Sequence, residues 1–218
     1  MIPLRSSERI YSTATVTLTI IAINVFVFLY ELSLSHYALN RFIMQEGIVP
    51  DRLHWTSLIT SMFIHGGFLH VAGNMWFFWI FGRGIEDLIG HARFLIFYFL
   101  CGLAAGLVHV IVNANSPVPT VGASGAIAGV MGAYLIKFPR ARIVTLVPIF
   151  IFITTLDIPA GFLLLYWFVI QFFSGVGSIS EMQQSGGDVA WFAHVGGFLA
   201  GMGLIMLMPA KQRYRPYY

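Results

Sequence analysis

Residues 121–137 read VGASGAIAGVMGAYLIK, a run of small residues with a serine, Ser124, near its start and a lysine at its end. An α-helix from Ser124 to Phe138 would be ~22 Å long at ~1.5 Å per residue, whereas the hydrocarbon core of a bilayer is ~30 Å thick. If the basic end of this helix lies at one membrane surface, its other end does not reach the opposite surface. The stretch therefore predicts a short membrane helix whose first residue, Ser124, is held within the bilayer.

Two interpretations of Ser124 are open on this stretch alone. Small residues in membrane helices usually mark close helix packing, and a serine among them is usually a packing residue. The alternative is a chemically active serine, for which partners must be found elsewhere in the chain.

The composition is that of an integral membrane protein. Of the 218 residues, 58% are hydrophobic and only 10% are charged, whereas a soluble domain has about 25% charged residues. The sequence pI of about 9.2 does not indicate nucleic-acid binding, because the basic residues lie at the ends of apolar runs. The first apolar run is too long for a signal peptide and is interpreted as a retained anchor.

The apolar runs predict an all-α, polytopic bundle of six spans in a single domain, residues 1–218. The predicted spans are at about 13–32, 67–84, 94–112, 124–138, 159–173 and 189–208. Residues 33–65 are too apolar for a free loop and too interrupted for a span, so we expect a structured connection at the membrane interface. Residues 143–154 are rich in β-branched residues and predict an interfacial or re-entrant segment.

The distribution of basic residues favours six spans with both termini in the cytoplasm. In this orientation the basic residues on the inside are Arg5, Arg9, Arg83, Arg93, Lys137, Arg140, Arg142, Lys211, Arg213 and Arg215. Arg41 and Arg52 lie outside. The sequence therefore predicts a multi-pass protein of the cell membrane (plasma or inner membrane), with Ser124 toward the outer half of the bilayer.

Polar side chains within the spans are costly and tend to mark function. His70 and Asn74 lie four residues apart on one face of the second span, His65 precedes that span, and His194 lies in the sixth. Each is also compatible with a structural role, as a hydrogen-bonding or packing residue. A zinc site built from the three histidines is not favoured, because HGGFLH lacks the glutamate of HExxH and no acidic ligand accompanies it.

Small residues on the fourth and sixth spans favour one joint site. The two faces are Ser124, Ala128 and Gly132 on the fourth span, and His194, Gly197 and Gly201 on the sixth. Such faces allow the backbones of two helices to approach closely. Their packing predicts that His194 lies near Ser124, within hydrogen-bonding range.

The chemistry available at such a site is acyl transfer. A serine becomes a nucleophile when an adjacent base takes its proton, and no acidic residue within a span would complete a triad, so the pattern predicts a Ser124–His194 dyad. The first backbone N–H groups of the fourth span have no partner within their helix. Together with His70 and Asn74, they are candidate donors to an oxyanion.

Four motifs, in order and spacing, resemble those of the rhomboid intramembrane serine proteases, and the match covers nearly the whole chain. The motifs are His65 followed by His70-x-x-x-Asn74, GRGIEDLIG with Glu86, GASG from Gly122 to Gly125, and AHVGGFLAG with His194, Gly197 and Gly201. The resemblance implies that Ser124 is the nucleophile and His194 the general base. It also implies that His70, Asn74 and the Ser124 backbone N–H serve the oxyanion.

The resemblance further implies structural support from His65, Glu86 and the motif glycines, with Glu86 tying the first loop to the second span. It implies six helices around a water-filled cavity that opens outward, with neither metal nor cofactor. The implied partners are the lipid bilayer and transmembrane protein substrates, cut where their helices unwind easily. The fifth span and residues 175–188 correspond to the proposed gate and cap, and no oligomeric state is predicted.

The chain departs from the family pattern at Ala128, where many members carry a tyrosine under the catalytic imidazole. One alternative function is that of a catalytically inactive relative that binds transmembrane helices; such proteins usually lack the serine or the histidine, and this chain has both. A channel or transporter is disfavoured, because the sequence has neither internal repeats nor several charges in mid-span.

Overall fold

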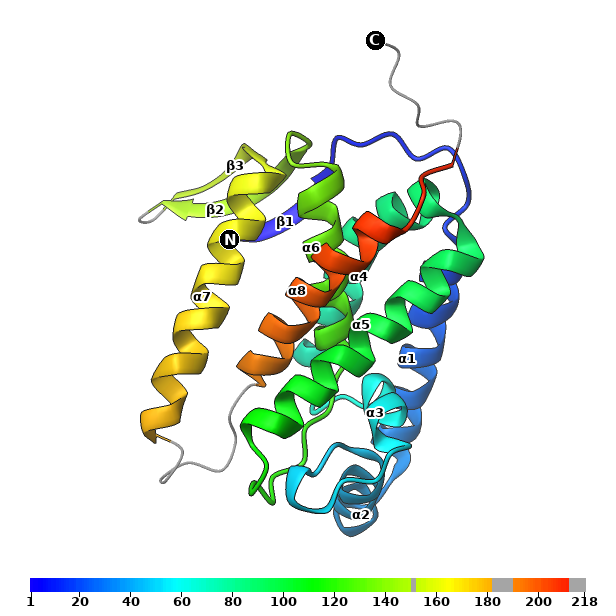
Figure 1. The fold of residues 1–218 in the computed structure, drawn as a ribbon, viewed down its shortest axis with the longest axis vertical. Helices are drawn as coiled ribbons and strands as arrows, with labels where there is room; N and C mark the ends of the chain where they lie inside the picture. Colours follow the sequence, from blue (N-terminus) through cyan, green and yellow to red (C-terminus); the bar gives the residue numbers. More distant parts are fainter. Residues whose placement is uncertain (150–151, 182–189, 212–218) are drawn as a thin grey trace.

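The computed structural model describes residues 1–149, 152–181 and 190–211, and it is mostly helical. The six longest helices of this part of the chain are α1 (Thr15–Ser33), α4 (Phe68–Ile89), α5 (His91–Val112), α6 (Ser124–Lys137), α7 (Ala160–Glu181) and α8 (Trp191–Leu207). They form a bundle with α6 inside it, packed against α4, α5, α7 and α8 (Figure 1). With 14 residues, α6 is the shortest of these helices, as the sequence predicts.

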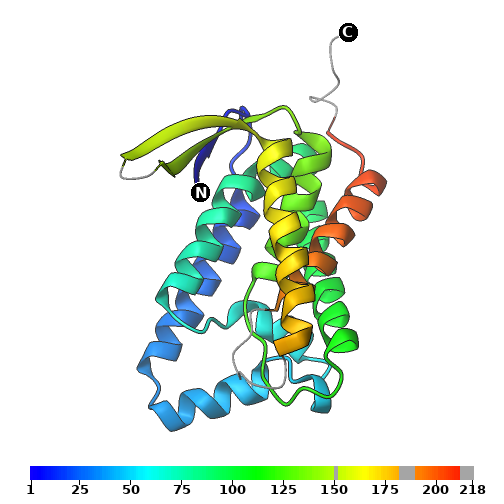
Figure 2. The same ribbon diagram turned by 90° about the vertical axis from the view of Figure 1, so that its left-hand side faces the viewer.

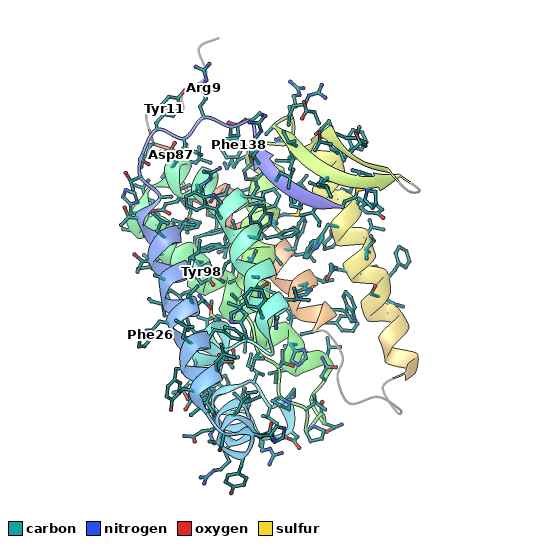
Figure 3. The ribbon with its side chains drawn as sticks, turned by 180° about the vertical axis from the view of Figure 1, so that it is seen from behind. Arg9, Tyr11, Phe26, Asp87, Tyr98 and Phe138 are labelled. Carbon is teal, nitrogen blue, oxygen red and sulfur yellow. The ribbon has the colours of Figure 1, made fainter. Side chains whose placement is uncertain are left out.

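The outer surface of the bundle is apolar. Phe26 of α1 points away from the bundle with 73% of its surface exposed, whereas Tyr98 of α5 lies inside it and is fully buried (Figure 3). Within the described residues, α1 and α5 are by length and composition able to cross a membrane, and α6, α8 and residues 160–176 of α7 are shorter apolar helices. The bundle thus presents to its surroundings the kind of side chain that favours lipid over water.

A three-stranded antiparallel sheet lies at one end of the bundle. Its strands, in the order β1-β2-β3, are β1 (Ile2–Ser6), β2 (Arg142–Ile149) and β3 (Phe152–Pro159). The hairpin of β2 and β3 extends sideways from the bundle (Figure 2). The prediction of an all-α chain therefore holds for the bundle but not for this end, because residues 143–149 and 152–154 of the predicted interfacial or re-entrant segment belong to strands. The buried side chains of Ile143, Thr145 and Val147 alternate with more exposed neighbours, which is the period of a strand.

The connection after α1 is structured, as predicted. It contains α2 (His36–Glu46), η1 (Pro50–Arg52), α3 (Ser57–Thr60) and η2 (Ser61–Phe63). The Ser35 hydroxyl accepts a hydrogen bond from the backbone N–H of Ala38 and so caps the first turn of α2. These short helices lie at the end of the bundle opposite the sheet (Figure 1).

The helices of the second and third predicted spans, α4 and α5, meet more closely than the sequence predicts. α4 continues to Ile89 and contains the GRGIED segment, and α5 begins directly after Gly90, whose φ of +90° favours glycine. α4 continues past its acidic residues because their carboxylates have partners. Asp87 accepts hydrogen bonds from the backbone N–H of Tyr11, at 2.9 Å, and from the Ser12 hydroxyl; Asp87 and Tyr11 are labelled in Figure 3.

α7, the helix of the fifth predicted span, is also longer than predicted. α7 continues to Glu181, so residues 175–181 of the expected cap are helical. The remainder of that segment, residues 182–188, and the predicted start of the sixth span at residue 189 lie outside the described residues.

Glu86 joins α4 to the start of α1. Its buried carboxylate accepts hydrogen bonds from the backbone N–H groups of Val16 and Thr17, both at 2.8 Å, and from the Thr17 hydroxyl at 2.6 Å. His91 Nδ1 lies 2.6 Å from the same carboxylate. The expectation that Glu86 ties the first loop to α4 is therefore wrong. The unpaired N–H groups and the positive dipole at the start of α1 attract this carboxylate instead.

Replacing Glu86 with alanine is expected to lower the free energy of unfolding by about 3 kcal/mol, because hydrogen bonds to a charged group contribute roughly 1.5–3 kcal/mol each and buried donors would lose their acceptor. Thermal unfolding of the purified protein in detergent measures the change. Asp157→Ala, which removes an exposed carboxylate on β3, is the control. Equal unfolding temperatures for the two variants would contradict this role of Glu86.

Candidate active site

Ser124 is the first residue of α6 and follows a loop held by backbone hydrogen bonds. Thr120 and Ile48 exchange two such bonds, of 2.9 and 2.8 Å, and the N–H of Gly122 donates to the carbonyl of Ser61 at 2.9 Å. Gly122 has a φ of +127°, a conformation that a residue with a side chain rarely adopts. The loop therefore turns sharply into α6 and leaves the Ser124 side chain partly accessible.

His194 lies beside Ser124 although 70 residues separate them. Its Nε2 is 2.8 Å from Ser124 Oγ, which is a hydrogen bond, and its side chain is buried. His194 is in the first turn of α8 and Ser124 in the first turn of α6. The starts of these two packed helices thus bring a hydroxyl and an imidazole together.

Glycines set the distance between α6 and α8. A Cβ added at Gly197 would lie 2.0 Å from the carbonyl oxygen of Gly125, and one added at Gly201 would lie 1.9 Å from that of Gly129. No side chain fits at either position without moving a backbone. On α6 the contact includes Gly125 and Gly129, each one position after a residue of the predicted face. It also includes Gly132 of that face, where an added Cβ would lie 2.2 Å from the carbonyl oxygen of Phe198.

The second nitrogen of the His194 ring has a partner that the sequence analysis missed. Nδ1 lies 2.5 Å from Oε1 of Gln171, a buried side chain of α7. The ring of Trp167, one turn earlier on α7, has its centroid 5.8 Å from that of the imidazole. Ala128, at the position where many family members carry tyrosine, is buried. A signal for Gln171 was present in the sequence, since it is an amide within the apolar run of the fifth span.

His70 and Asn74 lie on α4 beside the turn at Gly122. A Cβ added at Gly122 would lie 2.9 Å from His70 Nε2 and 3.6 Å from Asn74 Nδ2. The N–H of Gly66 donates to His70 Nδ1 at 3.4 Å, so the neutral ring carries its own proton on Nε2. Asn74 Nδ2 is buried and has no hydrogen-bond partner among the described residues. Two side-chain donors are therefore available close to Ser124.

A cavity of about 310 Å³ brings these groups together. Its polar lining is His70, Asn74, Ser124, Gln171 and His194, and its apolar lining includes Leu69, Phe77, Ile127, Met131, Trp167 and Trp191. Side chains from α4, α6, α7 and α8 form its walls. The site is thus a polar centre surrounded by aromatic and aliphatic groups.

His65 is buried behind this site. Its ring centroid is 5.0 Å from that of His70. Burial, with a smaller contribution from His70, lowers the pKa of His65 to about 4, so the ring is neutral at physiological pH. Its backbone N–H donates to the buried carboxylate of Glu31 at 3.1 Å. Glu31 of α1 therefore ties down the end of the first loop, the role that the resemblance gave to Glu86.

Within residues 1–149, 152–181 and 190–211, no group of three or more His, Cys, Asp or Glu side chains is placed to hold a metal ion.

Comparison with known proteins decides the family. A model of the rhomboid domain matches residues 52–211. The chain belongs to the rhomboid family. It is 30% identical to RHOMBOID-like protein 5 of Arabidopsis thaliana over 179 residues, which are 81% of this chain and 50% of that protein. It is 37% identical to rhomboid protease GluP of Bacillus subtilis over 81 residues, which are 37% of this chain and 15% of that protein.

A third rhomboid relative is the mitochondrial presenilin-associated rhomboid-like protein of Rattus norvegicus. It is 27% identical over 199 residues, which are 88% of this chain and 48% of that protein. The chain thus spans about half the length of RHOMBOID-like protein 5 and about half the length of the presenilin-associated rhomboid-like protein. Membership of the rhomboid family makes it a membrane protein, in a family that contains serine proteases.

Proposed function

We propose that this rhomboid protein is an intramembrane serine endopeptidase that cleaves transmembrane segments of other membrane proteins. The observation that carries the proposal is the 2.8 Å hydrogen bond between Ser124 Oγ and His194 Nε2 at the wall of a cavity. A serine with a base at this distance is the arrangement required for nucleophilic catalysis. Its place in the rhomboid family, one of whose members is named a protease, supports the same function.

In the first step, Ser124 Oγ attacks the carbonyl carbon of a peptide bond while His194 Nε2 accepts the hydroxyl proton. The carbonyl oxygen becomes an oxyanion, which needs donors aimed at it. The backbone N–H of Ser124 is one such donor, since the first N–H groups of a helix are not used within it. His70 Nε2 and Asn74 Nδ2 supply two more.

The second half of the reaction returns the proton. The carbon–nitrogen bond breaks as His194 Nε2 protonates the leaving amine, and an ester of Ser124 remains. A water molecule then loses a proton to His194, attacks the ester carbon and releases the carboxylic acid, so that Ser124 recovers its proton. Cys101 of α5, whose side chain faces Gly129 of α6, is fully buried and takes no part in the proposed reaction.

The proposed substrate is a membrane-spanning segment because of what surrounds the cavity. Aromatic and aliphatic side chains of α4 and α7, among them Phe77 and Trp167, line it. Nearer the start of α7, the side chains of Phe162 and Leu165 are largely exposed. A helix that unwinds locally would offer its backbone to Ser124 while its side chains remain in apolar surroundings.

We further propose six membrane spans, α1 and α4 to α8, with both ends of the chain in the cytoplasm of the cell membrane. Arg5, Arg93, Arg142 and Lys211 lie toward the sheet end, whereas Arg41 and Arg52 lie at the end with α2. The positive-inside rule places the sheet end in the cytoplasm. Ser124 then lies in the outer half of the bilayer.

The function is tested with purified protein in detergent and a single-span reporter that carries a different tag on each side of its membrane segment. The expected result is two tagged fragments, together with labelling of the Ser124-containing peptide by a fluorophosphonate, as detected by mass spectrometry. A chelator is expected to leave the cleavage rate unchanged. Reporter binding without cleavage or labelling would instead indicate an inactive, helix-binding relative and would overturn the proposal.

A further inference from the structure

We propose that Gln171 is a positioning residue that fixes the orientation and tautomer of the His194 ring. This inference rests on the proposed function, because it assigns a role within the same reaction. It begins from the 2.5 Å distance between Gln171 Oε1 and His194 Nδ1. Gln171 touches the base and not the serine, so any effect on the reaction passes through His194.

The tautomer follows from the two hydrogen bonds of the ring. Neutral histidine has one N–H and one lone pair, and an amide oxygen only accepts hydrogen bonds. The contact with Gln171 Oε1 therefore requires the proton on Nδ1, which leaves the lone pair of Nε2 directed at Ser124 Oγ. This is the only neutral tautomer in which His194 can take the proton of Ser124. The opposite tautomer would donate to Oγ and could not act as the base.

The hydrogen bond between Gln171 and His194 also stabilises the ring after proton transfer. When Nε2 takes the Ser124 proton, the ring becomes a cation with N–H groups at both nitrogens. Gln171 Oε1 already accepts from Nδ1, so the negative end of the amide dipole faces the new charge without rearrangement. A preorganised dipole of this kind stabilises charge that develops in the transition state.

The surroundings of the ring show why a hydrogen-bonding partner matters in this chain. At position 128, where a tyrosine would supply a ring under the imidazole, the side chain is only a methyl group. Trp167 and Trp191 have ring centroids 5.8 and 6.4 Å from that of His194, and both limit its space. Neither contact selects which nitrogen carries the proton, whereas the Gln171 amide does.

The bond crosses from α7 to α8. Gln171 is buried near the middle of α7, and α7 packs against α8. The base is therefore oriented by a helix different from those that carry the dyad. A displacement of α7 away from α8 would remove the partner of Nδ1 and leave the tautomer of His194 free.

The test compares three variants with the unchanged protein. Gln171→Leu keeps most of the side-chain volume but has no acceptor, whereas Gln171→Glu retains an acceptor oxygen in either protonation state. Phe173→Leu changes an exposed residue of the same helix and is the control. The measurements are the second-order rate of Ser124 labelling by a fluorophosphonate, kcat and KM for the reporter, and the unfolding temperature.

For Gln171→Leu we expect labelling and kcat to fall about tenfold or more, the loss of roughly one neutral hydrogen bond in the transition state. KM and the unfolding temperature are expected to change little. Gln171→Glu should recover most of the rate, and Phe173→Leu should match the unchanged protein. In protein labelled with ¹⁵N-histidine, the signal that disappears in His194→Ala should be that of a ring protonated on Nδ1, and Gln171→Leu should alter it.

Three results would overturn the inference while leaving the proposed function intact. The first is equal labelling and kcat in Gln171→Leu and the unchanged protein, with the latter active. The second is a His194 ring protonated on Nε2 in the active protein. If the unchanged protein neither labels nor cleaves, the proposed function itself fails. If Gln171→Leu and Gln171→Glu lose stability and activity together, Gln171 is a packing residue only, which also contradicts the proposal.

Discussion

Alanine in place of Ser124 is expected to lower reporter cleavage by at least ~10⁴-fold, equivalent to ~5 kcal/mol of transition-state stabilisation. The change removes one oxygen atom and keeps the Cβ, so the packing of α6 is unaffected. The lost hydroxyl is on a cavity wall, where water can take its place beside His194 Nε2. The unfolding temperature should therefore remain close to that of the unchanged protein.

A double-variant experiment sharpens this prediction. If Ser124 and His194 act as one unit, Ser124→Ala combined with His194→Ala should be no less active than either variant alone, because groups that act together are strongly non-additive. Ser33→Ala, which changes an exposed serine at the end of α1, is the control and should retain full activity. Cleavage that survives in Ser124→Ala would mean that another group attacks the peptide, and the proposed mechanism would be wrong.

The sequence predicted the helical bundle because membrane spans carry a strong signal. A run of apolar residues of sufficient length has few alternatives to a helix in lipid, where each backbone group must find a partner within its own segment. The short α6 and the structured connection after α1 follow from length and composition in the same way. The proximity of Ser124 and His194 followed from glycine spacing, since glycines at helical intervals predict close backbone approach.

The ends of the helices were less predictable because polar residues there are satisfied by distant partners. Glu86 and Asp87 look like the end of a span, yet α4 continues past both because the start of α1 supplies hydrogen-bond donors. β2 pairs with β1 across more than 130 residues of sequence. β-branched residues alone do not distinguish such a strand from an interfacial segment.

The partner of His194 shows the same limit within the site. Gln171 has no spacing relation to Ser124 or to His194 that would have singled it out. Only the packing of α7 on α8 brings its amide to Nδ1. Glu31 was missed for a similar reason, because its contact with the His65 N–H depends on the path of the first loop. Residues that act by tertiary contact alone leave only a weak trace in a single sequence.

Alanine in place of Gly201 is expected to destabilise the bundle and to abolish activity together. Its Cβ would lie 1.9 Å from the carbonyl oxygen and 2.4 Å from the carbonyl carbon of Gly129, so α6 and α8 must separate. Overpacking against flexible side chains costs roughly 1–3 kcal/mol. Here the obstructing atoms are backbone, and we expect a loss at the upper end of that range or beyond.

The effect on activity follows because α6 and α8 carry the two halves of the dyad. A displacement of about 1 Å between reacting groups is enough to lower a rate ~10²-fold, and Gly201→Ala requires a separation of that order between the helices. Gly203→Ala is the matched control on α8, since a Cβ there meets nothing within 4 Å. It should retain activity and gain roughly 0.5–1 kcal/mol of stability, the usual advantage of alanine over glycine in a helix. Thermal unfolding and fluorophosphonate labelling of both variants measure the difference. If Gly201→Ala were as stable and as reactive as Gly203→Ala, the close contact of α6 and α8 would not be what brings Ser124 and His194 together.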